Sequence, residues 1–175
     1  EINYNERYTM TRIEFLVVHH TATSLSTTVE DLRRMHVDER GWKDIGYHWI
    51  VRMNKQGRAV TEEGRPQDGD GNLEPWEYGA HVRGSNSKSL GIAVVGNFSE
   101  YPMAPALQKE LLATLTKLCL HLGLSPEFAI RSHNEMPDTA TECCGKLVDM
   151  EEIRHKVSGM LQVVTDVMEK YEWKH

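Results

Sequence analysis

The chain alternates between short runs of consecutive apolar residues and longer segments in which apolar residues recur every three or four positions. The short runs predict buried strands, and they cover residues 13–20 and 90–95. Residues 45–53 are rich in aromatic and β-branched side chains, and a polar turn links them to a short segment at 58–61. This pattern predicts a β-hairpin. A last short strand is expected at residues 128–132.

The segments with helical periodicity predict three long helices. The first covers residues 28–39, where Thr27 and Glu30 have the spacing of a capping box. The second begins at Pro105, and a leucine repeat carries it as far as residue 122. Asp149 is expected to cap the last helix, whose predicted buried stripe comprises Ile153, Val157, Met160, Val164 and Val167. Strands interleaved with about three helices predict an α/β fold with a mixed central β-sheet.

Length and composition narrow the possible classes of protein. A chain of 175 residues predicts a single domain, in which we expect residues 1–11 to be an N-terminal extension and residues 12–170 to be the core. A net charge of −6 argues against a nucleic-acid partner. No apolar stretch approaches the roughly 18 residues that span a bilayer. A monomer is favoured, and no signal peptide is evident at residues 1–10.

Candidate metal ligands lie at or just after the ends of two predicted strands. One strand ends in His19 and His20, another leads into His133, and Cys143 and Cys144 follow at short range. Imidazole and thiolate are preferred ligands of Zn²⁺, and three protein ligands with one open position define a catalytic zinc site. Adjacent residues of a regular strand point to opposite faces, so one member of the histidine pair is expected to bind the metal.

Four groups of residues, in order and with compatible spacing, resemble the successive motifs of the type-2 N-acetylmuramoyl-L-alanine amidases. That family includes bacteriophage T7 lysozyme and the peptidoglycan recognition proteins. The resemblance covers roughly residues 13 to 150, and it implies the fold of those proteins. The groups are residues 17–23 (VVHHTAT), 41–50 (GWKDIGYHWI), 79–86 (GAHVRGSN) leading to 89–92 (SLGI), and 132–135 (SHNE) with 141–143 (TEC).

The resemblance also implies roles for individual residues. It implies that one zinc ion is held by His19, His133 and Cys143, and that Tyr47 and Thr141 act in catalysis. In a regular strand, Tyr47 would share a face with Trp49. The long segment from residue 62 to residue 89 offers stacking surface and hydrogen-bond donors for a muropeptide substrate, and the candidate substrate-binding residues there are Trp76, His81, Arg83 and Asn86.

The implied function is zinc-dependent hydrolysis of the amide between N-acetylmuramic acid and the L-alanine of the peptidoglycan stem peptide. The alternative is a module that binds or senses peptidoglycan without cutting it, and in this family loss of the ligand cysteine marks such members. The sequence does not decide in which cellular compartment the protein acts. A secreted or periplasmic protein would have lost a signal peptide, whereas a phage protein would act from the host cytoplasm on the cell wall.

One departure from the family pattern concerns the third ligand. Relatives of the T7 type usually place the cysteine eight residues after the second histidine, whereas the interval from His133 to Cys143 is ten. An insertion of two residues within positions 136–140 would explain the longer interval. The neighbouring Cys144 therefore remains an alternative ligand.

Overall fold

The computed structural model describes residues 11–172, so residues 1–10 of the expected N-terminal extension lie outside the described residues. In chain order the elements are β1 (Thr11–Arg12), β2 (Phe15–His20), α1 (Val29–Arg34), the π-helical turn η1 (Met35–Glu39), β3 (Trp49–Met53), β4 (Ala59–Glu63), β5 (Asn72–Leu73), β6 (Ser89–Val94), α2 (Pro105–Leu122), α3 (Pro126–Ala129), β7 (Ile130–Ser132), the 3₁₀ turn η2 (His133–Glu135) and α4 (Met150–Glu172).

The main sheet has five strands in the order β4-β3-β6-β2-β7. The pairs β3/β6, β6/β2 and β2/β7 are parallel, whereas β3 and β4 form the predicted antiparallel hairpin. A separate antiparallel pair joins β1 to β5. The α/β class and the mixed central sheet are therefore confirmed.

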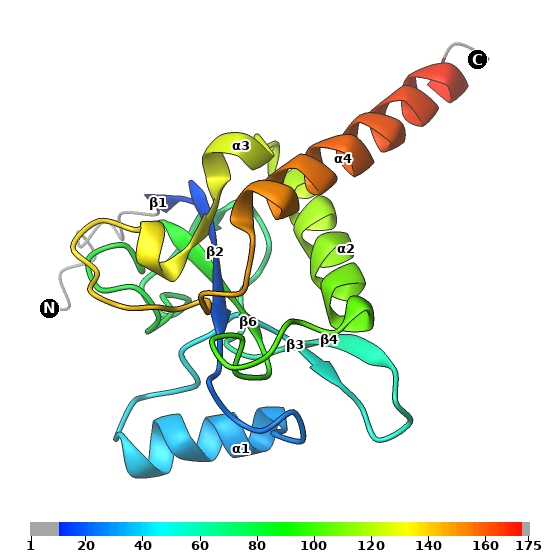
Figure 1. The fold of residues 1–175 in the computed structure, drawn as a ribbon. Coiled ribbons are helices and arrows are strands. Elements are labelled where there is room, and N and C mark those ends of the chain that lie inside the picture. The colour runs from blue at the N-terminus through cyan, green and yellow to red at the C-terminus, as the bar shows by residue number, and fades with distance from the viewer. Residues whose placement is uncertain (1–10, 173–175) are drawn as a thin grey trace, which may run out of the picture.

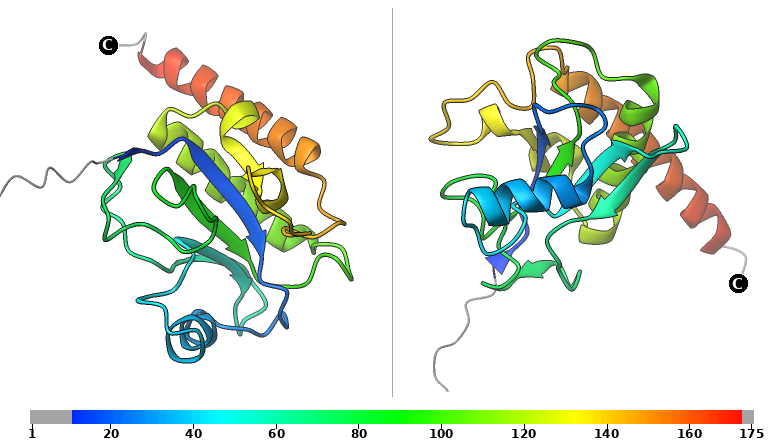
Figure 2. Two further views of the ribbon diagram at one scale, coloured as in Figure 1. Left: turned by 90° about the vertical axis from the view of Figure 1, so that its left-hand side faces the viewer. Right: turned by 90° about the horizontal axis from the view of Figure 1, so that it is seen from below.

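The two faces of the sheet are covered by different helices. Even-numbered residues of β2 and β6, such as Leu16 and Ile92, belong to the largest apolar cluster, which includes residues of α2 and α4. On the opposite face, Ile50 and Val95 pack with residues of α1. Figures 1 and 2 show α1 lying apart from α2 and α4, with strands of the sheet between them. Helices on both sides explain why the central strands are apolar on both faces.

Strand β3 is shorter than the predicted strand at 45–53, because it begins at Trp49. Before that residue, the backbone N–H of Gly46 donates to Nδ1 of His36, and the carbonyl of Gly46 accepts from Ala80. These bonds hold Gly46 outside the ladder. Tyr47 consequently packs with the cluster beneath α1, whereas Trp49 belongs to the cluster on the other face. The strand is therefore not regular at residue 47, and Tyr47 does not share a face with Trp49.

The expected strand at 128–132 is also shorter, because Pro126 starts the one-turn helix α3. Proline is suited to the first helical position. Phe128 therefore lies in α3 with 72% of its surface exposed, and the strand covers Ile130–Ser132.

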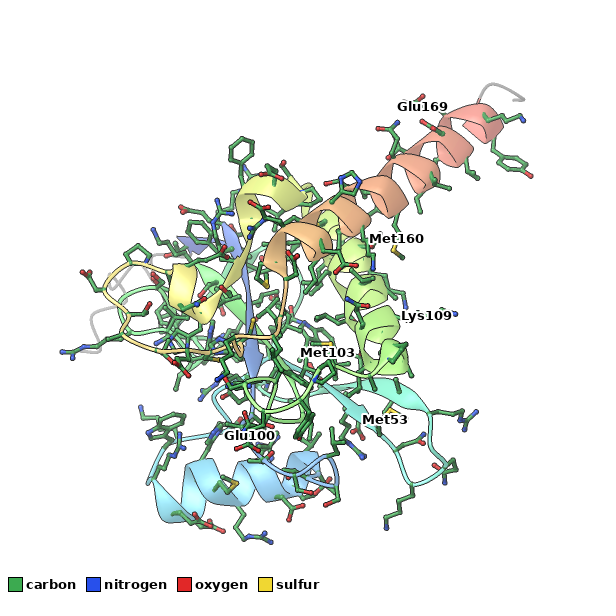
Figure 3. The ribbon with its side chains drawn as sticks, viewed as in Figure 1. Met53, Glu100, Met103, Lys109, Met160 and Glu169 are labelled. Atoms are coloured by element: carbon green, nitrogen blue, oxygen red, sulfur yellow. The ribbon has the colours of Figure 1, made fainter. Side chains whose placement is uncertain are left out.

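Helix α4 is capped as predicted, since Asp149 accepts the backbone N–H of Glu152. The buried stripe, however, ends early. Val157 is fully buried, whereas Val167 is 48% exposed. Figure 1 shows the C-terminal half of α4 extending beyond the rest of the molecule, and Figure 3 shows Glu169 on this extension. Among residues 11–172, no helix is long and apolar enough to span a membrane.

The capping box of α1 lies one residue later than predicted. The side chain of Thr28 accepts the N–H of Asp31, and the Asp31 carboxylate accepts the N–H of Thr28. The predicted pair of Thr27 and Glu30 is therefore wrong, because Thr28 is the residue with extended backbone that precedes the first helical residue. Helix α2 ends at Leu122 as predicted, and Gly123 after it adopts the left-handed conformation with φ of 64°.

We expect Thr28→Ala to lower the free energy of unfolding by about 1 kcal/mol, because the helix loses its side-chain cap. Urea denaturation followed by circular dichroism measures the change. Thr27→Ala is the matched control, and it should alter stability by less than about 0.5 kcal/mol. An equal loss for both variants would contradict the assignment of the cap.

Candidate metal centre

Three side chains from distant parts of the chain converge on the face of the sheet opposite α2 and α4. One ligand atom from each of His19, His133 and Cys143 lies within 4.8 Å of the other two. Nδ1 of His19 is 3.6 Å from Sγ of Cys143, and the ring centroids of His19 and His133 are 4.7 Å apart. Two imidazoles and one thiol at this separation form a donor set that fits one divalent metal ion with an open position.

The alternation of β2 separates the two adjacent histidines. His19 points to the site and is 2% exposed. His20 points the other way, and its Nδ1 accepts the backbone N–H of Phe98 at 3.0 Å. His20 is thus a hydrogen-bonded structural residue, and the expectation that one member of the pair faces the site is met by this geometry.

The loop between His133 and Cys143 is closed at its base. The N–H of Asn134 donates to the carbonyl of Cys143 at 2.9 Å, and the hydroxyl of Thr139 donates to the carbonyl of His133 at 3.0 Å. This closure brings Cys143 close to His133 across the ten-residue interval. Cys144 is 3% exposed and its thiol points toward Sδ of Met150, away from the histidines.

The turn that carries His133 is held by an ion pair that sequence analysis missed. Ser132 and Glu135 form a capping box around this turn. Arg154 of α4 donates to both oxygens of the Glu135 carboxylate, at 3.0 and 3.2 Å, and to the carbonyl of Ile130 at 3.2 Å. The Ser-x-x-Glu spacing at 132–135 was a readable signal of the capping box. No sequence pattern near Arg154 indicates that its side chain pairs with Glu135.

Burial sets the protonation of the candidate ligands. It lowers the pKa of His19 well below the usual imidazole value, with the neighbouring histidines adding to the effect, and it lowers the pKa of His133. Both are therefore neutral near pH 7, which is the form that binds metal. Burial raises the pKa of the Cys143 thiol to about 11. This thiol needs a nearby cation to ionise at neutral pH.

The two predicted catalytic residues lie beside this cluster. The ring centroid of Tyr47 is 5.1 Å from that of His19, and burial, followed by the proximity of Cys143, raises the pKa of the phenol to about 12. Tyr47 is thus a neutral hydrogen-bond donor at pH 7. The hydroxyl of Thr141 accepts the N–H of Cys143 at 3.1 Å and keeps its own hydrogen for donation.

The four predicted substrate-binding residues differ in position. Trp76 is 55% exposed and donates its indole N–H to Glu74, and Arg83 is exposed as well. Asn86 organises its own loop, because its side-chain oxygen accepts the backbone N–H of His81 at 2.9 Å. His81 is 7% exposed and lies directly behind His19. Substrate contact by these residues stays a prediction.

Comparisons with known proteins agree with the motifs. Residues 9–146 match the family model described as N-acetylmuramoyl-L-alanine amidase. The human protein of that name is 30% identical over 142 residues, which are 75% of this chain and 22% of that protein. The endolysin of Enterobacteria phage K11 is 32% identical over 134 residues, covering 73% of this chain and 76% of the endolysin.

The fold is also similar to solved structures. The N-acetylmuramoyl-L-alanine amidase LysC of Clostridium intestinale aligns with a TM-score of 0.68 and 27% identity, covering 89% of this chain and 94% of that one. Against the human amidase, in contrast, this chain spans about a fifth of the relative's length.

We expect Cys143→Ser to lose bound divalent metal and Cys144→Ser to keep it, because the first thiol faces the histidines and the second faces Met150. Metal content after dialysis against Zn²⁺, measured by mass spectrometry, provides the comparison. Retention by the first variant together with loss by the second would assign the ligand to Cys144.

Proposed function

This chain belongs to the N-acetylmuramoyl-L-alanine amidase family, and from that premise we propose that it is a zinc-dependent hydrolase of the amide between N-acetylmuramic acid and L-alanine in peptidoglycan. The observation that carries the proposal is the convergence of His19, His133 and Cys143. The names of the K11 endolysin and of the amidase LysC support it, since the similarity to both covers most of this chain.

The donor set supports zinc in particular. Two neutral imidazoles and one thiolate suit Zn²⁺ better than the hard cations Mg²⁺ and Ca²⁺, which prefer oxygen ligands. When bound with one position open, zinc supplies Lewis-acid polarisation of a carbonyl group and lowers the pKa of water at that position. With zinc held by these three ligands, the proposed hydrolysis would not need a strongly basic side chain to activate water.

The side chains around the ligands have complementary roles in the proposal. Tyr47 donates its phenolic hydrogen to the oxygen of the scissile carbonyl as negative charge develops there. Thr141 donates a second hydrogen bond, and its position is held by the backbone of Cys143. Both donors are neutral and positioned by protein contacts, which is the arrangement that stabilises an oxyanion at little cost in reorganisation.

Recognition of the wall polymer is proposed to rely on local contacts. The chain has a net charge of −6, so long-range attraction to an anionic wall does not assist binding. The exposed Trp76 and Arg83 supply stacking surface and hydrogen-bond donors. A non-hydrolytic binding module is the alternative function, and the position of Cys143 within the cluster favours the enzyme.

We expect the zinc-loaded protein to release stem peptides with a free alanine amine from purified sacculi. Chelation should abolish release, and added Zn²⁺ should restore it. Labelling of new amines followed by mass spectrometry identifies the product. Binding to sacculi without any release of peptide would refute the hydrolase and support the binding module.

We expect Tyr47→Phe to lower turnover by about 10²-fold while metal content stays unchanged, because the variant loses an oxyanion donor and no ligand. Tyr171→Phe is the matched control, since Tyr171 is 67% exposed on α4. Unchanged turnover in the Tyr47 variant would remove Tyr47 from the mechanism.

A further inference from the structure

His81 is a buried histidine that touches a candidate metal ligand without joining the cluster. Its Nδ1 lies 3.0 Å from Nε2 of His19, and its Nε2 lies 3.2 Å from the carbonyl oxygen of Ser89. The two rings meet edge to face, with centroids 5.1 Å apart. Both nitrogens of His81 thus face protein atoms, and one of those atoms belongs to the ligand His19.

The contacts at Ser89 determine which nitrogen of His81 carries the hydrogen. A carbonyl oxygen accepts and never donates, so Nε2 must donate to it. The hydroxyl of Ser89 is 3.4 Å from the same Nε2, and its own hydrogen is donated to the carbonyl of Ser85 at 2.7 Å. This hydroxyl therefore also presents a lone pair to Nε2. Neutral His81 accordingly has its hydrogen on Nε2 and a lone pair on Nδ1.

The same reasoning extends to His19. Because Nδ1 of His81 is an acceptor, Nε2 of His19 must be the donor across the 3.0 Å contact. The lone pair of His19 is then on Nδ1, which is the nitrogen 3.6 Å from Sγ of Cys143. We propose that His81 is a positioning residue that holds His19 in the Nε2–H tautomer and thereby presents Nδ1 to the metal ion.

The surroundings of His81 keep its ring in this orientation. A Cβ atom at Gly91 would lie 2.7 Å from the His81 ring, and one at Gly79 would lie 2.5 Å from it. The two glycines therefore provide the space that the ring fills. The side chain of Asn86 accepts the backbone N–H groups of His81 and Val82 at 2.9 Å each, which fixes the backbone from which the ring projects.

A second buried histidine, His48, packs against the ring of His81. Nδ1 of His48 accepts the N–H of Gly91 at 2.9 Å, and Nε2 of His48 lies 2.9 Å from the carbonyl of Glu77. The His48 and His81 rings are in edge-to-face contact at 5.6 Å. This contact packs His81 against the sheet, so His81 has a fixed place between β6 and His19.

The proposal rests on the metal-binding part of the proposed function and does not depend on catalysis. Long-range ¹H–¹⁵N correlation spectra of the metal-free protein at pH 7 report the tautomer of each histidine. We expect His19 as the Nε2–H tautomer before metal is added, and bonding through Nδ1 when ¹¹³Cd²⁺ is the probe. A His19 hydrogen on Nδ1, or coordination through Nε2, would overturn the proposal.

Two variants separate hydrogen bonding from packing. In His81→Asn, the side-chain oxygen takes about the place of Nδ1 and still accepts from His19, whereas His81→Leu has no acceptor. We expect the leucine variant to lose about 10-fold to 100-fold in Zn²⁺ affinity, as for the loss of other hydrogen-bond partners of ligand histidines. The asparagine variant should lose distinctly less and keep the His19 tautomer.

The exposed His121 provides the control, since its Nε2 contacts the carbonyl of Gly69 and not His19. The His121→Leu variant should bind Zn²⁺ like the wild type. Competition titration with a chromophoric chelator measures affinity, and urea unfolding of each metal-free variant shows whether it folds. If the leucine variant fails to fold, the asparagine variant and the wild-type spectra still decide. Wild-type affinity in a folded leucine variant would refute the role of His81. If the wild-type protein shows the expected tautomer and the variants show the expected affinities, but the zinc-loaded protein releases no peptide, the proposed hydrolase function alone is refuted.

Discussion

The parallel pairing of β2 with β7 is the constraint on which the candidate metal centre depends. The register sets Val18 beside Ser132, so that the next residue of β2 is His19 and the residue that follows the end of β7 is His133. Two imidazoles that lie more than a hundred residues apart in the chain are therefore brought together directly at the ends of neighbouring strands. The pairing is stable because β2 is a central strand, joined on its other side to β6 over six residue pairs.

One face of the sheet carries the main apolar core, and the other face carries the candidate metal centre. On the face toward α2 and α4, large aliphatic side chains such as Leu16 and Ile92 are fully or almost fully buried. On the other face, β6 presents Gly91 and Ala93 beside β2. The absence of a side chain at Gly91 leaves room for the His81 ring. Imidazoles occupy the position that aliphatic residues fill on the opposite face, and each that is buried there has a partner in the protein.

Helix α4 connects the two faces. Its first turns bury Ile153 and Val157 in the main core, while Arg154 reaches the capping box of the turn that carries His133. The guanidinium is largely shielded from water, with 10% of its side-chain surface exposed. An ion pair with little exposure and bidentate geometry orders its partners more effectively than one at the surface. The helix thereby helps to hold the turn that carries the candidate ligand His133.

Local sequence was sufficient for the elements whose signals are continuous in the chain. The apolar runs located β2 and β6, the leucine repeat and Gly123 bounded α2, and alternation implied that one of His19 and His20 faces the site. Motif similarity then named His19, His133 and Cys143 together, although no spacing rule could show that they meet. The predicted boundaries of strands were wrong where the backbone of a residue forms its hydrogen bonds with a distant segment, as at Gly46.

Contacts between distant segments decided the remainder. The closed loop base brings Cys143 close to the two histidines, whereas the thiol of Cys144 contacts Met150. The space above Gly91 is filled by the ring of His81, which contacts His19. The exposed half of α4 has the same apolar period as its buried half, so periodicity could not reveal where neighbouring elements end. Sequence periodicity encodes which side chains share a face, whereas burial and hydrogen-bond partners depend on what the completed fold brings against that face.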